Sequence, residues 1–168
     1  MSHFHANQLL IAKPDLTDPN FSRTVVHLVE HDAEGALGVV LNRPMTIPVS
    51  EHFDSLVAAV SYPPVFFEGG PVASGSVVAI GSSGGAPPRL VDIDGLLGGS
   101  TPMPDQLRLF AGYAGWSAGQ LEGELLGGLW IVAETRRDDL GGDDLFGANP
   151  GDLWRSVLRR QPRPMPAR

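Results

Sequence analysis

The sequence contains no cysteine and is poor in positive charge. The absence of cysteine excludes disulfide bonds, thiolate catalysis and sites in which cysteine binds zinc or an iron–sulfur cluster. Lysine and arginine number 12 against 19 aspartates and glutamates, so the formal net charge is -7. Because such a charge repels phosphate backbones, direct DNA binding is not expected.

Long hydrophobic runs and nucleotide-binding motifs are also missing. The 20 residues 69–88 carry no charge, but 13 of them are glycine, proline or serine, which predicts strand and loop instead of a membrane span. No G-x-x-x-x-G-K-[ST] phosphate loop occurs, and Gly69-Gly70-Pro71 does not fit a dinucleotide-binding turn. The first residues lack the basic flank and apolar stretch of a signal peptide. We therefore expect a cytoplasmic protein without a cofactor or a membrane partner.

The composition that is present predicts one domain. A chain of 168 residues with 42% hydrophobic side chains can bury a core of its own. Glycine and proline together make up 36 residues, so we expect many short elements joined by tight turns. We place the domain at residues 1–161 and expect a disordered tail at 162–168, which contains three prolines.

Local patterns predict short strands mixed with helices. Two β-branched runs, 24–31 and 36–41, surround a glycine-containing turn and predict a hairpin. Ser50, Ser117 and Asn149 are expected to cap three helices. The other predicted elements are strands at 65–68, 76–80, 89–93, 106–111 and 130–133, and helices at 50–60, 117–126 and 149–161. Because hairpin connections dominate, we predict an α+β fold with a bent, largely antiparallel sheet surrounded by helices.

Several short motifs follow one another along the chain. They are Asn7-Gln8-Leu9-Leu10-Ile11-Ala12, Glu30-His31-Asp32, Glu34-Gly35-Ala36-Leu37-Gly38, Leu41-Asn42-Arg43-Pro44, Gly69-Gly70-Pro71-Val72, Gly112-Tyr113-Ala114-Gly115-Trp116, Gly119-Gln120-Leu121-Glu122 and Leu153-Trp154 with Arg159-Arg160-Gln161. In this order the chain resembles the YqgE/AlgH family of bacterial proteins. The resemblance implies a bifurcated α+β architecture without an established catalytic activity or cofactor, and some members are labelled transcriptional regulators. The chain departs from the family pattern between Ala73 and Thr101.

A serine motif and the histidines are the candidates for chemistry. Gly115-Trp116-Ser117-Ala118-Gly119 matches the G-x-S-x-G turn that presents a nucleophilic serine in hydrolases. Every histidine lies at or before position 52, however, so the chain order of serine, aspartate and histidine cannot follow Ser117. His27 and His31 are about 13 Å apart on a predicted strand, too far to share one metal ion. We assign no catalytic residue and no metal site.

The hairpin contains a secondary candidate site at Glu30 and His31. One of its predicted faces is apolar apart from Glu30, and carries Val26, Leu28, Leu37, Val39 and Leu41. His31 is predicted to face the other way, beside Gly38, where a glycine can allow another group to approach closely. Structural and functional roles are both open for Glu30 and His31.

Three loops at the ends of predicted strands form the main candidate ligand site. They contain Asn42, Arg43, Gly69, Gly70, Tyr113 and Trp116. Arg43 would supply a forked donor for a carboxylate or phosphate, and Tyr113 and Trp116 would supply flat surfaces. The alternative is that these residues only make turns and cover a core.

These observations favour a non-enzymatic binding or regulatory protein that recognises a small molecule or a protein partner. One alternative is a hydrolase-like enzyme that uses Ser117 or the Glu30 and His31 pair. Another is a direct DNA-binding regulator, which the family label favours and the net charge disfavours.

Overall fold

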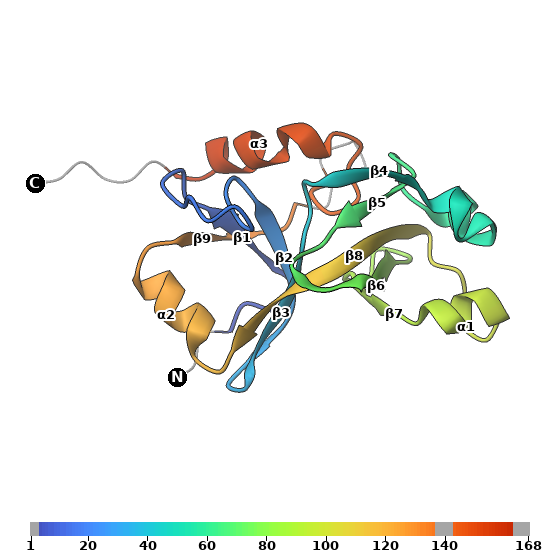
Figure 1. Cartoon of the computed structure of the whole chain (residues 1–168), viewed down its shortest axis with the longest axis horizontal. Coiled ribbons are helices and arrows are strands. Elements are labelled where there is room, and N and C mark those ends of the chain that lie inside the picture. The colour runs from blue at the N-terminus through green and yellow to red at the C-terminus, as the bar shows by residue number, and fades with distance from the viewer. Residues whose placement is uncertain (1–3, 137–142, 163–168) are drawn as a thin grey trace, which may run out of the picture.

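The computed structural model describes residues 4–136 and 143–162, and most of its regular structure is strand (Figure 1). The strands are β1 (Gln8–Ala12), β2 (Val25–Asp32), β3 (Gly35–Val40), β4 (Pro44–Pro48), β5 (Val65–Glu68), β6 (Val72–Ser82), β7 (Arg89–Val91), β8 (Gln106–Ser117) and β9 (Trp130–Glu134). The α-helices are α1 (Ile93–Gly98), α2 (Gln120–Leu126) and α3 (Leu153–Arg159). The 3-10 helices are η1 (Val49–Glu51), η2 (Asp54–Ala59) and η3 (Pro150–Asp152).

Strand β8 joins the two halves of a forked sheet. Its C-terminal part pairs with β3, and its N-terminal part pairs with β5 and β6. Beyond β3 the order continues through β2, β1 and β9, whereas β4 extends the other half from β5 and β7 pairs with β6. In the described part of the chain the strand pairs are antiparallel except for β5 with β8. The structure confirms the predicted α+β fold with its bifurcated, largely antiparallel sheet.

Side chains of β8 alternate between the two faces of the strand and pack in two different apolar clusters. Leu107 and Leu109 are buried in a cluster that also contains residues of the 3-10 helices and α1. Phe110 faces the fork between the two half-sheets, where it packs against Phe67 of β5. Arg108 is two residues before Phe110 and therefore lies on the same, fork-facing side of β8. Its side chain is a buried cation, because Arg108 is only 1% exposed.

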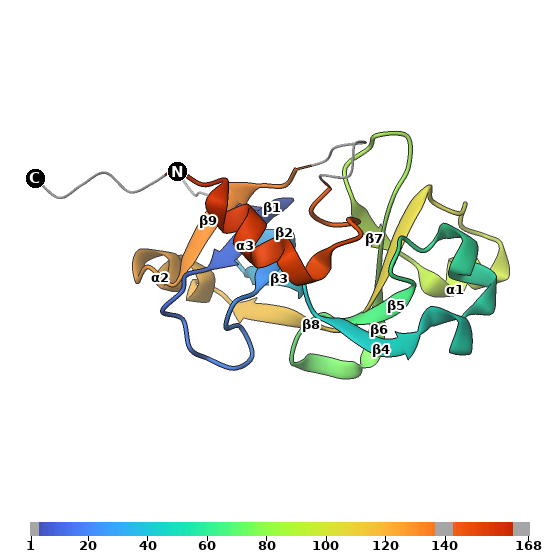
Figure 2. The same ribbon diagram turned by 90° about the horizontal axis from the view of Figure 1, so that it is seen from above.

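Helices α3 and α2 cover opposite faces of the half-sheet made of β9, β1, β2 and β3 (Figures 1 and 2). Val157 of α3 is buried in one cluster with Leu9 and Ile11, and Leu121 of α2 is buried in another with Leu10. Because neighbouring strand residues point to opposite faces, a strand covered on both sides is apolar throughout. None of the described helices is long and apolar enough to cross a membrane.

The predicted hairpin is confirmed, but the predicted facing of its side chains is wrong. A bulge interrupts the pairing between Leu28 and Glu30, and Val26 lies opposite Val40. Val26 and Leu28 therefore pack with Val40 on the α2 side, whereas Val39 belongs to the cluster on the α3 side. A bulge inserts one extra residue, so every side chain beyond it changes face relative to a regular strand.

The helix predicted at 50–60 consists instead of the two 3-10 helices η1 and η2. Pro48 and Phe53 occupy the positions before them, so Ser50 caps neither. Ser117 is the last residue of β8, and Gly119 in a left-handed conformation precedes α2. A capping box has two hydrogen bonds, one to the side chain of the glutamine and one to the side chain of the serine. The first is present, because the backbone amide of Ser117 donates to Oε1 of Gln120 at 3.0 Å, but Ser117 makes no side-chain cap of α2.

The predicted strands are correct in place; β5 also has the predicted bounds 65–68, whereas others differ in length. Strand β6 extends over 72–82 where 76–80 was predicted, and β8 extends over 106–117 where 106–111 was predicted. Strand β7 is shorter than the predicted 89–93 because Ile93 begins α1. The tail predicted at 162–168 lies, from residue 163 on, outside the described residues.

Candidate functional site

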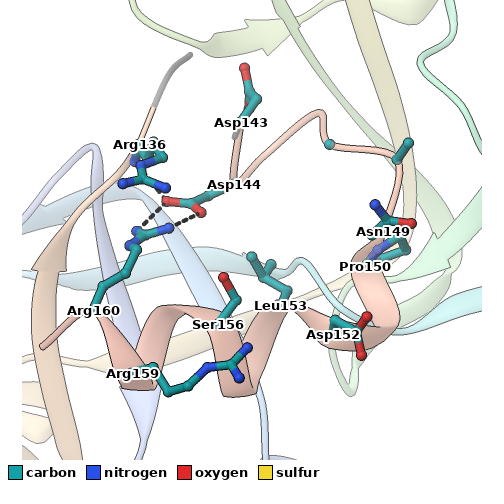
Figure 3. Close-up of a pocket in the computed structure, with 12 residues that line it drawn as sticks. Arg136, Asp143, Asp144, Asn149, Pro150, Asp152, Leu153, Ser156, Arg159 and Arg160 are labelled. Carbon is teal, nitrogen blue, oxygen red and sulfur yellow. Dashed lines mark hydrogen bonds and ion pairs between the residues drawn. The ribbon is translucent and has the colours of Figure 1, made fainter. Parts of the chain in front are cut away.

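A polar cavity of about 240 Å³ lies beside α3, between the loop that precedes this helix and the residues that follow β9 (Figure 3). We call it the α3 cavity. Its charged lining residues are Arg136, Arg159, Arg160, Asp143, Asp144 and Asp152. Three arginines and three aspartates carry formal charges that cancel, so the wall is highly polar without a net charge.

Helix α3 and the residue that follows it place three polar side chains at the cavity, those of Ser156, Arg159 and Arg160. Pro150 begins the 3-10 helix η3 after Asn149, but the predicted cap is wrong because the side chain of Asn149 makes no capping hydrogen bond. Leu153 and Val157 fix the buried face of α3, as their spacing predicts. Ser156 and Arg160 are four residues apart and therefore share another face of the helix. Figure 3 shows both side chains on the side of α3 that faces Asp144.

The carboxylate of Asp144 is buried and accepts three hydrogen bonds. Arg160 donates from Nη1 to Oδ1 at 2.7 Å and from Nη2 to Oδ2 at 2.8 Å. The backbone amide of Arg136 donates to Oδ2 at 2.6 Å, and the amide of Asp144 donates to the carbonyl of Arg136 at 3.0 Å. The hydrogen bonds to Asp144 raise the pKa of Arg160 above its usual range. This cluster ties the end of α3 to the segment that follows β9.

Asp143 and Arg108 hold the loop that forms another part of the wall. Oδ1 of Asp143 accepts hydrogen bonds from the amides of Leu145 and Phe146 at 2.9 and 2.8 Å. Nη1 of Arg108 donates to the carbonyls of Leu145 and Gly147 at 2.8 and 3.2 Å. Burial lowers the pKa of Arg108 to about 10, and the charge of Asp143 opposes that shift. Arg108 therefore remains a cation at neutral pH and anchors the loop to the core.

The arrangement suits binding better than bond making. Both oxygens of Asp144 already accept hydrogen bonds, and Arg160 is committed to the same carboxylate. Three of the roughly four acceptor positions of the carboxylate are thus occupied within the protein, which favours a structural role for Asp144 over that of a general base. Ser156 and Asn149 add a hydroxyl and an amide to the wall, which can each donate and accept hydrogen bonds. Within residues 4–136 and 143–162, no group of three His, Asp or Glu side chains could hold a metal ion.

The three loops of the predicted ligand site do meet, at the point where the sheet forks. The amide of Gly69 donates to the carbonyl of Ala111, and the amide of Val40 donates to the carbonyl of Gly69. Gly70 has φ +156°, and a side chain there would overlap the backbone of Tyr113. These glycines permit close contact between main chains. The loops thus converge through backbone packing.

The polar residues of these loops have partners within the protein. Arg43 donates to the carbonyls of Asn20, Pro19 and Ser22 at 2.8, 3.1 and 3.2 Å, and lies 3.9 Å from Glu68. These bonds hold the connection between β1 and β2. Binding of a ligand by Arg43 stays a prediction.

Asn42 also bridges main-chain groups across the hairpin. Its Oδ1 accepts from the amide of Val25 at 3.0 Å, and its Nδ2 donates to the carbonyl of Arg23 at 2.9 Å. A side-chain amide used in this way extends the β-ladder past its end. A role for Asn42 in ligand binding likewise stays a prediction.

The two aromatic residues of the predicted site lie in different clusters. Tyr113 packs against the cluster that fills the fork, whereas Trp116 is buried on the α2 side. Nε1 of Trp116 and Nε1 of Trp130 both donate to Oε1 of Glu124, at 3.0 and 2.9 Å. Trp116 is therefore anchored beneath α2.

Glu30, His31 and Ser117 have different environments and different partners. Glu30 is exposed, whereas His31 is buried and its Nε2 lies 3.4 Å from Oε1 of Glu122 on α2. Nδ1 of His31 lies 3.0 Å from the backbone amide of His5, which donates to it. Oγ of Ser117 bonds to Oε1 of Gln120 at 3.3 Å. Among the described residues no hydrogen bond joins Ser117 to a histidine.

Reasoning from sequence missed Arg108, Asp144 and Ser156. The sequence offers one weak signal for Arg108, which is a charged residue inside the apolar run of a predicted strand. Asp144 has no such signal, because its partner Arg160 is 16 residues away, and the loop, η3 and α3 between them set their distance.

Comparisons with known proteins agree with this architecture. A family model described as AlgH-like matches residues 9–166. The chain belongs to the AlgH-like family. A UPF0301 protein of Streptomyces coelicolor is 42% identical over 169 residues, which cover 92% of this chain and 85% of that protein.

Two solved structures are similar in fold. The crystal structure of DIP2367 from Corynebacterium diphtheriae has a TM-score of 0.81 and 27% sequence identity, and the match covers 97% of this chain and 90% of that one. The solution structure of AlgH from Pseudomonas aeruginosa, a UPF0301 protein, has a TM-score of 0.69 and 30% identity, with 92% and 87% covered. The resemblance inferred from the sequence motifs is thereby confirmed.

Proposed function

We propose that this AlgH-like protein is a non-enzymatic binding protein that holds a small polar molecule in the α3 cavity. The observation that carries the proposal is the ion pair between buried Asp144 and half-buried Arg160, which forms a hydrogen-bonded wall beside an open polar space. Side chains whose hydrogen bonds are already satisfied hold a binding site in one shape before the ligand arrives.

The size and charge of the α3 cavity limit the class of ligand. A volume of about 240 Å³ is smaller than the roughly 300–1,000 Å³ of sites for drug-sized molecules. The formal charges of its lining residues cancel, and Ser156 and Asn149 can both donate and accept hydrogen bonds. These properties favour a small zwitterion or an uncharged polar molecule of about the size of an amino acid over a strongly charged phosphate.

A thermal-shift screen tests this function. Wild-type protein is heated with amino acids, small carboxylic acids, sugars and nucleotides in turn, because a ligand of the folded state raises the melting temperature. We expect a small zwitterion or neutral polar compound to raise it. Ser156→Leu should abolish the increase by filling the cavity, Ser156→Ala should reduce it, and Arg155→Gln, on an exposed position of α3, should preserve it. An increase that persists in Ser156→Leu would place the ligand elsewhere and defeat the proposal.

We also propose a cytoplasmic location and a regulatory role. The sequence supports the location because it contains no cysteine, which fits a reducing compartment. A net charge of -7 disfavours direct contact with DNA, so an effect on transcription would operate through a protein partner.

A further inference from the structure

A second concave surface lies at the end of the molecule that carries α1, away from the α3 cavity. It is a groove of about 490 Å³ lined mainly by residues of β6, β7 and α1. Figure 1 shows these three elements side by side at that end of the molecule. We call it the β6 groove. Its apolar lining includes Phe53, Val77, Leu90, Ile93 and Leu97. The groove therefore differs in chemistry from the α3 cavity, whose lining is mainly charged and polar.

Two large apolar side chains of the β6 groove are open to solvent. Leu90 of β7 is 44% exposed and Leu97 of α1 is 45% exposed. Single exposed leucines are common on protein surfaces, but leucines that line a shared groove offer a contiguous surface that a partner can bury. Burial of the exposed part of each side chain by a partner removes apolar surface from water and is favourable.

The backbone of β6 is open along part of the same groove. Strand β6 has 11 residues, but β7 pairs only with Ala79, Ile80 and Gly81 before the chain turns into α1. Val77 and Val78 pair with β8 on one side, and no strand of the described residues pairs with their other side. An open strand edge beside apolar pockets is the arrangement that accepts an added peptide strand.

The charge at the β6 groove is entirely negative. Asp92 and Asp94 are exposed and line it, and the chain as a whole carries -7. A partner with lysine or arginine beside its apolar residues complements this charge. A second copy of this chain does not, because a two-fold contact through the same surface would bring four aspartates together.

We propose that the β6 groove binds an extended segment of a partner protein, with alternating apolar side chains and at least one lysine or arginine, which adds as a strand next to Val77 and Val78. The apolar side chains would contact Leu90 and Leu97, and the basic residue would lie at Asp92 and Asp94. This inference is independent of the ligand proposed for the α3 cavity.

A selection of random seven-residue peptides displayed on phage tests the proposal. Wild-type protein should enrich peptides with alternating apolar residues and a lysine or arginine. Affinity should fall about tenfold or more in Leu97→Glu and in Leu90→Glu, two variants of exposed positions on different elements. Leu126→Glu, on α2, replaces a leucine that is 92% exposed and should leave binding unchanged. In NMR spectra the selected peptide should shift the amides of Val77 and Val78.

Three results would overturn the proposal. The first is that no selected peptide depends on Leu90 or Leu97. The second is enrichment of acidic peptides at this surface. The third is a concentration-dependent dimer in sedimentation experiments that Leu97→Glu dissociates, because the groove would then be the contact between two copies of this chain.

Discussion

Arg160 holds the buried carboxylate of Asp144 through two hydrogen bonds, of 2.7 and 2.8 Å, across 16 residues of sequence. The pair connects the end of α3 to the segment after β9, because Asp144 also accepts from the amide of Arg136. The side chain of Asp144 is 2% exposed and that of Arg160 is 22% exposed. The shape of the α3 cavity therefore depends on an ion pair that water reaches from one side only.

Removal of Arg160 should destabilise the protein strongly. Arg160→Gln leaves the carboxylate of Asp144 buried without its cation, and we expect the free energy of unfolding to fall by about 3 kcal/mol. Arg155→Gln removes the same charge from an exposed position of α3 and should change stability by less than about 0.5 kcal/mol. Urea unfolding at pH 7 measures both. Equal stability of the two variants would show that the ion pair contributes nothing.

His27 should make the protein sensitive to acid. It is 1% exposed, and burial lowers its pKa from 6.5 to about 4. Between these values the unfolded chain binds a proton that the folded chain does not, so stability falls as the pH decreases from 6.5 towards 4. The loss amounts to about 3 kcal/mol.

The variant His27→Leu separates this effect from that of the carboxylates. Urea unfolding at pH 7.5 and at pH 4.5 gives, for each protein, the stability that is lost between these two pH values. We expect wild type to lose roughly 2–3 kcal/mol more than His27→Leu over this range. The same loss in both proteins would rule out His27 as its source.

Alanine substitutions at two glycines should change the stability of the protein in opposite directions. Gly70 has a positive φ, and a Cβ there would overlap the backbone of Tyr113, so Gly70→Ala should cost more than about 2 kcal/mol. Gly123 is exposed in α2 with open space around it, and Gly123→Ala should stabilise by roughly 0.5–1 kcal/mol. Thermal unfolding compares both with wild type. A neutral Gly70→Ala would contradict the close contact at the fork of the sheet.

Ser117→Ala tests the hydrolase alternative. Oγ of Ser117 bonds only to Gln120 among the described residues, so we expect a loss of less than about 1 kcal/mol. We also expect no covalent labelling of wild-type protein by a fluorophosphonate, since no histidine is hydrogen-bonded to this hydroxyl in the described residues. Labelling that disappears in Ser117→Ala would establish a nucleophilic serine and favour the enzyme.

The elements with local signals were predictable from sequence. A glycine between β-branched runs predicts the turn between β2 and β3, and Pro150 predicts the start of the helical segment formed by η3 and α3. The buried face of α3 follows from the helical spacing of Leu153 and Val157. Each of these features depends on residues that are near one another along the chain.

Features set by distant contacts were not predictable. The bulge after Leu28 changes the facing of β2, and nothing in a regular alternation of side chains reveals an inserted residue. Residues 73–76 form an irregular stretch of β6, with Ala73 at φ +50°, which the β-propensity of the segment does not indicate. The α3 cavity depends on Arg108 and on the Asp144–Arg160 pair, whose partners meet only after folding.

The most direct test of the central claim is NMR mapping of ligand contacts on ¹⁵N-labelled protein. Pools of amino acids and other small polar metabolites are added, and backbone amide shifts are followed residue by residue. The account predicts that a zwitterionic or neutral polar compound shifts the amides of Asp144, Asn149, Ser156 and Arg160 most strongly. Shifts centred on Arg43, Gly70 and Trp116, or no shift at α3 with any pool, would contradict it.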